Sequence, residues 1–389
     1  MIGGGLVGLA SARALASGGA TVLLLERSRE PGREASSAAA GLLVPQTERA
    51  MGRLGVASEP AEEAMLGLLL ESRRRFPAFA RELEEASGRS VHYRSDGSLL
   101  AALGDAEASA LAAWARGQTA RGLRAEWVDA AEARRLEPLL GPAVVGALLI
   151  PDDHQVDNVE LTLAALDAAT RAGVEVRASA PVAAVEAIEG RAAGVRLADG
   201  ARIEAALVVL AAGAWSGGLG GLPRPIPVRP IKGQMVALRP AGGTGIHRIV
   251  SLPGAYCVPR DDGRVLVGAT VEDAGFDTTV DTEASRALVA AAARVIPAFA
   301  AAPLVAHWAG LRPGTPDGLP LLGSDPALPG LLYATGHYRN GILLAPVTAE
   351  IVGSLARGGP PPVDLGPFSA DRAALAGSVP DPASEPMVR

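Results

Sequence analysis

Apolar and small residues near the start of the chain change their spacing within thirty positions. Residues 6–15 are mostly apolar or small, as in a helix packed closely on a sheet, and residues 20–25 form an apolar run of strand length. Only Met1 and Ile2 precede the first glycine, where a first strand normally has about five or six residues. The pattern predicts a βαβ unit with a truncated first strand, whose ladder hydrogen bonds are partly unmade. Our hypothesis for the truncation is a start codon placed too late or a trimmed chain.

Helical spacing dominates the segment that follows. Residues 62–85 have the apolar spacing of a long helix, although Pro77 should break or kink it. Alternating positions on both sides of the Asp-Gly pair at 96–97 predict a hairpin. Two further helices are expected, one from about Asp105 and one after Asp129, which with a glutamate three residues later fits a capping box.

The second half of the chain is richer in strands. Asp157 precedes another helix, and strands flank the Asp-Gly pair at 199–200. Residues 205–213 form a buried strand that ends in small residues, whereas residues 232–271 alternate as in an antiparallel sheet. The proline-rich end, residues 366–389, is expected to be an extended arm or tail. A parallel unit interrupted by β-rich insertions predicts two interleaved domains.

The first glycine-rich turn has the spacing of a dinucleotide site. Gly3, Gly5 and Gly8 make G-x-G-x-x-G, in which glycines allow a tight turn and the helix N-terminus attracts a pyrophosphate. The spacing alone is weak evidence, because glycine runs also occur in ordinary turns. Glu26 ends the next strand about twenty residues on, where a carboxylate can accept from ribose hydroxyls. The two features together predict that the turn binds a dinucleotide.

Composition narrows the class of protein. A chain of 389 residues with 49% hydrophobic and 20% charged residues suits two packed globular domains. The net charge of −6 offers no electrostatic footprint for nucleic acid. One cysteine, Cys257, excludes an internal disulfide, and the five histidines lack metal-ligand spacing, so we expect no metal. The longest apolar runs are too short to span a bilayer, and we expect a cytoplasmic protein without membrane contact.

Two late stretches are the most specific in the chain: HWAGLRPGTPDGLPLLG and LLYATGHYRNGILLAP. The second one reads as strand, glycine turn and helix, with the backbone N–H groups of residues 337–343 at the helix start. Such a helix start can stabilise negative charge on a reduced ring system, such as the pyrimidine edge of a flavin. A flavin here would complete a site whose other end is the glycine turn.

At this point the chain resembles the D-amino-acid oxidase family of flavoproteins, and within it the glycine oxidases associated with thiazole synthesis for thiamine. The resemblance covers nearly the whole chain. It rests on the motifs IGGGLVGLA, ASSAAAGLLVP, VVLAAGAWS, IKGQ, YCVPR, GRVLVGAT, GLRPGTPDGLPLLG, GHYRNGILLAPVTA and PFSADR. It implies noncovalent FAD, oxidation of an amine at the flavin, oxygen as acceptor, and leaves a homo-oligomer open.

The resemblance also gives the expected fold class and domains. The fold is α/β, with a Rossmann-like FAD-binding domain of the glutathione-reductase type interleaved with a substrate domain of antiparallel β-sheet plus helices. The expected FAD-binding domain comprises residues 1–85, 141–219 and 305–365. The substrate-binding domain then comprises residues 86–140 and 220–304, and residues 366–389 form the C-terminal tail.

The expected cofactor contacts come from both sources. The residue patterns supply Gly3, Gly5, Gly8, Glu26 and Gly213. The resemblance adds Leu6, Val7, Arg27, Ala35, Ser36, Ala40, Gly41, Leu42, Val182, His337, Tyr338, Arg339, Asn340, Gly341, Ile342 and Leu343.

Three residues match the substrate-binding positions of the family. Arg312 matches the arginine that grips the substrate carboxylate, for which a planar, permanently charged guanidinium is well suited. Tyr256 matches a tyrosine whose hydroxyl can donate to the same carboxylate, and Arg339 matches a second arginine of the pocket. A domain-bridging ion pair for Arg312 and core packing for Tyr256 remain alternatives. Gly254 and Val271 depart from the family pattern, which leaves the pocket volume and the substrate open.

The mechanism implied by the resemblance needs no side-chain base. The amine binds in its neutral form with its carboxylate on Arg312 and Tyr256, a hydride moves to the flavin, and oxygen then yields hydrogen peroxide. Glycine or another small amino acid is the expected substrate, and its imine either feeds thiazole formation or hydrolyses to glyoxylate and ammonia. The alternatives are an oxidase of sarcosine or another N-methyl amino acid, a D-amino-acid dehydrogenase, and an inactive flavin-binding paralogue.

Overall fold

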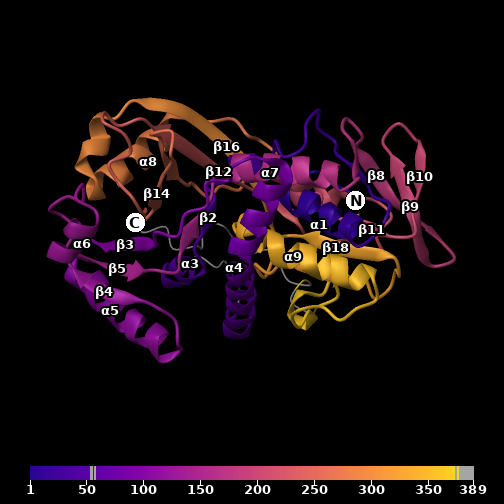
Figure 1. Cartoon of the computed structure of the whole chain (residues 1–389), viewed down its shortest axis with the longest axis horizontal. Coiled ribbons are helices and arrows are strands. Elements are labelled where there is room, and N and C mark those ends of the chain that lie inside the picture. Colours follow the sequence, from indigo (N-terminus) through magenta and orange to yellow (C-terminus); the bar gives the residue numbers. More distant parts are fainter. Residues whose placement is uncertain (53–55, 57, 373–374, 376–389) are drawn as a thin grey trace.

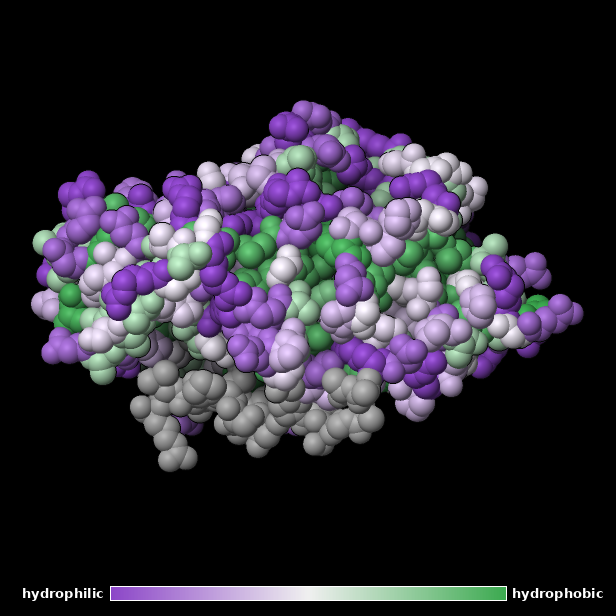
Figure 2. Space-filling model, turned by 90° about the horizontal axis from the view of Figure 1, so that it is seen from below, coloured by the Kyte–Doolittle hydropathy of each residue, from purple (hydrophilic) through white to green (hydrophobic). Residues whose placement is uncertain are grey.

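The computed structural model describes residues 1–52, 56, 58–372 and 375. Two sheets lie toward opposite ends of the long axis, with α4 and α7 between them (Figure 1). Seen from below, hydrophilic side chains cover much of both ends, and apolar side chains gather most strongly across the middle (Figure 2).

The helices, in chain order, are α1 Leu6–Ser17, α2 Ala35–Ala38, α3 Pro45–Ala50, α4 Glu59–Ser87, α5 Asp105–Ala120, α6 Ala130–Leu136, α7 Asn158–Arg171, α8 Thr282–Val295 and α9 Gly341–Ala356, with 3-10 turns η1 Gly213–Gly218, η2 Pro297–Ala301 and η3 Gly366–Phe368.

The parallel sheet occupies one end of the molecule. From one edge to the other, its strands are β7 Glu175–Arg177, β1 Leu23–Leu25, the single bridge residue Ile2, β11 Val208–Leu210, β18 Leu331–Thr335 and β17 Leu321–Ser324. Of these, only β17 runs antiparallel to its neighbour. Helices α1, α4, α7 and α9 share one hydrophobic core on its first face. The antiparallel strands β8 Val182–Ile188, β9 Arg191–Leu197 and β10 Arg202–Glu204 share a second core with the other face. The predicted βαβ unit and the hairpin at 199–200 are confirmed.

Residues 1–3 take the place of the first strand. The Ile2 amide donates to the Val209 carbonyl, and the Gly3 amide donates to the Leu25 carbonyl, both at 2.9 Å. The Ala211 amide returns a bond to the Ile2 carbonyl at 2.8 Å. Residues 1–3 therefore lie between β1 and β11 and form hydrogen bonds with both neighbouring segments. The truncated first strand was expected to leave such bonds unmade.

The eight-stranded sheet occupies the other end of the molecule (Figure 1). Its order is β16 Leu304–Gly314, β12 Arg229–Leu238, β15 Val265–Gly268, β14 Ala255–Pro259, β13 Ile249–Leu252, β3 Ser98–Ala102, β5 Gly146–Ile150 and β4 Glu126–Asp129. All neighbours are antiparallel except β13 and β3. Strands β5 and β16 were expected in the FAD-binding domain, so the expected boundaries at 141 and 305 fall inside this sheet. A small ribbon of β2 Leu42–Leu43 and β6 His154–Gln155 completes the strands.

Two local predictions are wrong. Helix α4 continues through Pro77, because Met65, Leu69, Phe76 and other apolar residues bury one face along its whole length, which outweighs one lost backbone hydrogen bond. The pair at 96–97 forms no regular hairpin: β3 begins at Ser98, and the chain before it pairs only through a bridge between Arg94 and Gln155.

Capping residues behave as predicted. The Asp129 carboxylate accepts from the Glu132 amide at 2.9 Å at the start of α6. The Asp157 carboxylate accepts from two amides at the start of α7, at 2.9 and 3.0 Å. Each cap satisfies helix N–H groups that have no partner within the helix.

The described start of the expected tail is packed, not extended. Phe368 and Ala370 are buried, and Arg372 pairs with the buried Asp317 at 2.6 Å. Residues 373–374 and 376–389 of the expected tail lie outside the described residues. Among the helices of the described chain, none is both long and apolar enough to cross a bilayer.

Candidate active site

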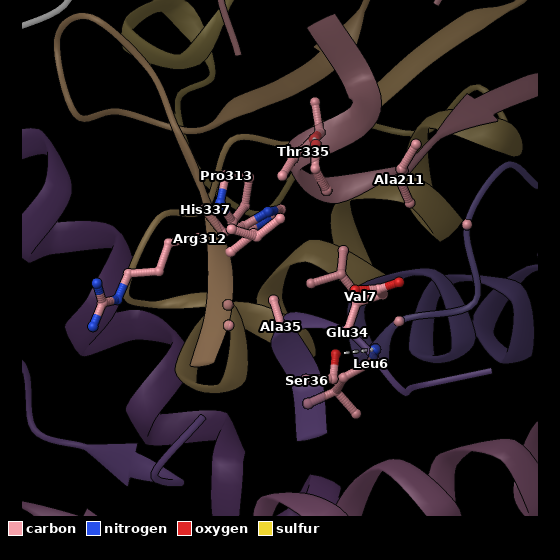
Figure 3. Close-up of a pocket in the computed structure, with 18 of the residues that line it drawn as sticks. Leu6, Val7, Glu34, Ala35, Ser36, Ala211, Arg312, Pro313, Thr335 and His337 are labelled. Atoms are coloured by element: carbon pink, nitrogen blue, oxygen red, sulfur yellow. Dashed lines mark hydrogen bonds between the residues drawn. The ribbon is translucent and has the colours of Figure 1, made fainter. Parts of the chain in front are cut away.

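One cavity of about 740 Å³ brings together the predicted site residues from both ends of the chain. Every predicted residue lines it except Gly8 and Leu343. The volume lies within the range typical of cofactor and ligand sites. In Figure 3 the Arg312 side chain lies on one side of the view, and Leu6, Ser36 and Ala211 lie on the other.

The glycine turn is built by close backbone approach. Gly3 has φ of +104°, and a Cβ there would lie 2.4 Å from the Ala211 carbonyl oxygen. The Leu6 amide at the start of α1 has no acceptor within its own helix; it donates to Ser36 Oγ at 2.9 Å, a contact drawn in Figure 3. Two segments thirty residues apart therefore form one wall of the cavity.

Gly8 and Leu343 act in packing and do not line the cavity. A Cβ on Gly8 would lie 2.0 Å from the Gly3 carbonyl oxygen, so this glycine lets α1 pack against the turn. Leu343 is buried among the helices, and its carbonyl accepts from Ser72 Oγ at 2.6 Å. Their packing roles are clear from these contacts, and their contact with the cofactor stays a prediction.

Glu26 and Arg27 end β1 at the cavity. One carboxylate oxygen of Glu26 accepts from the Gly4 amide at 2.8 Å, and the other accepts from the Ser28 amide at 2.7 Å. Arg27 pairs with Glu34 at 3.0 Å, and its guanidinium carbon lies 3.7 Å from the centre of the Trp215 ring. Glu26 thus holds the turn in shape, and its role toward a ribose stays a prediction.

Two neutral polar side chains, His337 and Asn340, line the cavity just before α9. Burial lowers the pKa of His337 to about 4, so its imidazole is uncharged at neutral pH, and its Nε2 lies 3.0 Å from Thr348 Oγ. The Nδ2 atom of Asn340 is buried and has no hydrogen-bond partner in the described part of the chain. Backbone N–H groups of the first helical turn and this amide are the donors that the cavity presents here.

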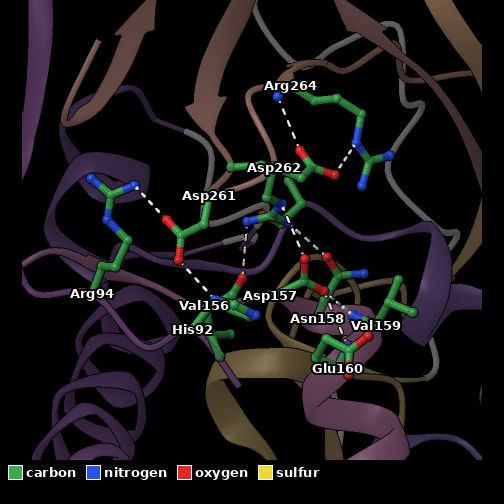
Figure 4. A network of polar contacts seen from close by, with 12 residues as sticks. His92, Arg94, Val156, Asp157, Asn158, Val159, Glu160, Asp261, Asp262 and Arg264 are labelled. Carbon is green, nitrogen blue, oxygen red and sulfur yellow. Dashed lines mark hydrogen bonds and ion pairs between the residues drawn. The ribbon is translucent and has the colours of Figure 1, made fainter. Parts of the chain in front are cut away.

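Arg260 fixes the segment that carries Ala40 and Gly41. Its buried guanidinium donates to the Ala40 carbonyl and the Asn158 side chain, both at 2.9 Å, and to the Val156 carbonyl at 3.1 Å (network in Figure 4). Gly41 has φ of +68°, and a Cβ there would lie 1.9 Å from the Val156 oxygen. The hairpin that bears Tyr256 is therefore tied to the segment expected to approach the flavin.

Arg312 lies on β16 at the substrate end. Its Nη1 donates to the Thr270 carbonyl at 3.1 Å and to the Lys232 carbonyl at 3.3 Å. Gly233 on the neighbouring strand β12 makes room for it, because a Cβ there would lie 2.2 Å from Arg312 Nη2. The guanidinium is thus held by backbone carbonyls at the cavity wall.

Tyr256 lies on β14, and its hydroxyl is 3.8 Å from Met235 Sδ. A Cβ on Gly268 would lie 2.7 Å from that hydroxyl, so a second glycine makes room for a second substrate-site side chain. Tyr256 is only 7% exposed but lines the cavity, so it combines both readings of the sequence: it packs in the sheet and presents its ring to the site.

Arg339 faces a buried acid that the sequence motifs did not identify. Its Nε lies 3.8 Å from Glu48 Oε2, and the two side chains are 10% and 8% exposed. Glu48 lies on α3, and its Oε2 has no hydrogen-bond partner among the described residues. The charge of this arginine is therefore partly balanced by the protein itself.

Helix α3 rests on a buried carboxyl group. Asp153 Oδ2 accepts from Thr47 Oγ at 2.5 Å and from Ser98 Oγ at 2.9 Å, whereas Oδ1 has no described partner. Burial raises the pKa of Asp153 to about 6, and these hydrogen bonds and Arg73 oppose the rise. The group therefore titrates between weakly acidic and neutral pH.

We expect Asp153→Asn to make the protein relatively more stable as pH rises. Because the pKa is raised on folding, the native state binds more protons than the unfolded state between about pH 4 and 6, so the wild type loses stability across this window. The difference in free energy of unfolding between variant and wild type should grow by on the order of 3 kcal/mol from pH 4 to 7. Urea unfolding at four pH values measures it. A difference that is independent of pH would contradict the assignment.

Sequence reasoning missed many of the cavity residues, and four of them bear on the site: Trp215, Glu48, Met235 and Phe276. Trp215 follows the recognised Gly213 by two positions and could have been found from that motif. Glu48, Met235 and Phe276 carry no local signal, because only the fold brings them to the cavity. Gly254 and Val271 are not among the lining residues, so they give no direct measure of the cavity volume.

The cysteine and the candidate metal ligands of the described chain do not form a metal site. Cys257 is fully buried in β14, and burial raises the pKa of its thiol to about 12. In the described chain no group of three or more His, Cys, Asp and Glu side chains is placed to hold a metal ion.

Known proteins match this chain over most of its length. The glycine oxidase of Pseudomonas putida is 36% identical over 374 residues, which cover 95% of this chain and 97% of that protein. The bifunctional protein ThiO/ThiG of Synechocystis is also 36% identical, but the chain spans only 51% of its length. The crystal structure of glycine oxidase from Geobacillus kaustophilus superposes with a TM-score of 0.87 at 35% identity, covering 95% of this chain and 97% of the other.

The family model agrees with these relatives. The model of the FAD dependent oxidoreductase family, DAO, matches residues 1–355. The match includes the glycine turn, the Arg312 strand and the start of α9, which the fold brings to one cavity. The resemblance inferred from the motifs is confirmed, and the chain belongs to the FAD dependent oxidoreductase family.

Proposed function

We propose that the protein is an FAD-dependent amino-acid oxidase that deaminates glycine or a similarly small amino acid. One observation carries the proposal: the same cavity joins the glycine turn at one end to Arg312 and Tyr256 at the other. Relatives named glycine oxidase match nearly the whole chain and support this choice of substrate.

The residues present fit FAD. The turn at Gly3 and the bend at Gly41 approach other backbone so closely that a side chain at either position would collide with it, which keeps the cavity walls free of side chains there. Asn340 lines the cavity, and its buried amide nitrogen has no described partner, so it is a candidate donor to a carbonyl-bearing ring. When bound, FAD supplies a hydride acceptor that oxygen can regenerate.

The protein contributes orientation and charge. Arg312 and the Tyr256 hydroxyl would bind the substrate carboxylate and direct the α-carbon to the cofactor. Met235, Leu42 and Val44 surround this end with apolar atoms, which exclude water and strengthen the charge pair. The products are the imine and hydrogen peroxide; the imine hydrolyses to glyoxylate and ammonia if it is released.

We propose a pathway for the imine product from the names of the relatives. The match to the ThiO half of a ThiO/ThiG protein supports supply of the imine to thiazole synthesis for thiamine. We propose the cytoplasm as the location.

Anaerobic mixing tests the proposal. The purified protein should be yellow, glycine should bleach the flavin absorbance, and air should restore it with release of hydrogen peroxide. Glycinamide, which lacks the carboxylate, should bleach it far more slowly. Faster bleaching by sarcosine or D-alanine than by glycine would assign the substrate to those amines. Bleaching that air does not reverse would indicate a dehydrogenase, and a yellow protein that no amine bleaches would indicate an inactive paralogue.

A further inference from the structure

The segment between β15 and α8, residues 269–281, contacts η1, the 3-10 turn that follows β11 of the parallel sheet. At its middle the Phe276 ring stacks on the Trp215 ring of η1, with centres 5.4 Å apart and an interplanar angle of 29°. The Arg27 guanidinium lies over the same indole. All three side chains line the cavity, and Phe276 is 54% exposed. We call this set of Arg27, Trp215 and Phe276 the aromatic clamp.

The clamp lies at the glycine-turn end of the cavity. Arg27 directly follows Glu26, which holds the Gly4 amide. Trp215 follows β11 through Ala211, whose carbonyl approaches Gly3. Because the turn is the expected pyrophosphate site, this end is where the adenosine half of a dinucleotide would be held.

Polar side chains on β12 hold the segment 269–281 on both sides of Phe276. Buried Lys232 pairs with Glu272 at 3.3 Å and with Asp277 at 3.6 Å. The Gln234 amide nitrogen donates to Glu272 at 2.9 Å and to Asp281 at 2.8 Å. The Phe276 ring is therefore positioned in advance of ligand binding, which lowers the entropy lost on binding.

We propose that the aromatic clamp holds the adenosine half of FAD and that Phe276 is its positioning residue. The exposed Phe276 ring can stack on a flat base. The neighbouring Trp215 indole and Arg27 guanidinium offer further stacking and cation–π contacts. This inference rests on the proposed FAD-dependent function and extends it to a residue of the segment between β15 and α8.

The test compares ligands that share different halves of the cofactor. FAD, ADP and FMN are titrated into apoprotein of the full chain, for the wild type, Phe276→Ala and Val280→Ala. Val280 is a matched control, because it is exposed in the same segment but does not line the cavity. Phe276→Ala should raise the Kd for FAD and for ADP by the same factor, roughly 5- to 30-fold, and should change the Kd for FMN less than about twofold. Val280→Ala should change none of them.

The other outcomes are distinct. An unchanged Kd for FAD in Phe276→Ala overturns the clamp, and equal weakening of FAD and FMN overturns its assignment to adenosine. Thermal unfolding of each apoprotein shows whether a weakened variant is still folded. Wild-type protein that binds none of the three ligands would overturn the proposed function itself, and the clamp with it.

Discussion

Arg312→Ala is expected to lower kcat/KM for glycine by roughly 30- to 1000-fold. The cavity places this guanidinium among backbone carbonyls at an apolar end, where a charge pair with the substrate carboxylate is poorly solvated. Removing one member of such a pair costs on the order of 2–4 kcal/mol of transition-state stabilisation. Steady-state peroxide release at several glycine concentrations measures the loss, and the flavin spectrum should remain.

Arg312→Lys separates charge from geometry. A lysine keeps the positive charge but cannot form a planar two-point contact with a carboxylate, so its activity should lie between those of the wild type and Arg312→Ala. Glycinamide provides a second control, because a substrate without the carboxylate should be indifferent to the change. Near-normal turnover of glycine by Arg312→Ala would remove the arginine from the substrate site.

Those parts of the fold that depend on short, local patterns could be predicted from the sequence. The glycine turn and α1 follow from residue spacing, and Asp129 and Asp157 cap their helices as their positions indicate. Arg312 and Tyr256 came from family motifs instead, since nothing in their own neighbourhoods fixes a carboxylate site. The fold explains why they meet: two glycines on neighbouring strands make room for them.

The rest could not be predicted because it depends on contacts between distant segments. Pro77 interrupts a pattern but not the helix, since packing along α4 decides the outcome. Glu48 and Phe276 look like ordinary residues of a short helix and a polar loop, and only the tertiary fold brings them to the cavity. The eight-stranded sheet likewise recruits β5 and β16 from segments that sequence order assigned to the other domain.

Gly8→Ala is expected to destabilise the protein and to weaken FAD binding, although alanine favours helix. In a helix interior with open space this substitution stabilises by about 0.5–1 kcal/mol. At Gly8 the new Cβ would lie 2.0 Å from the Gly3 carbonyl oxygen, so either α1 or the glycine turn must shift. Overpacking of this kind costs about 1–3 kcal/mol. The displaced turn should also raise the Kd for FAD at least about tenfold, because backbone N–H groups must point at the pyrophosphate.

Gly67→Ala is the matched control, because Gly67 lies inside α4 and a Cβ there meets no atom within 4 Å. Helix propensity alone should raise its free energy of unfolding by about 0.5–1 kcal/mol and leave the Kd for FAD unchanged. Urea unfolding of the apoproteins and FAD titration measure both quantities. Opposite signs for two identical substitutions would show that backbone contact, and not helix propensity, makes glycine necessary at position 8. Equal stabilisation by both would mean that the turn tolerates a side chain there, and that the close approach of α1 to Gly3 does not shape the cofactor site.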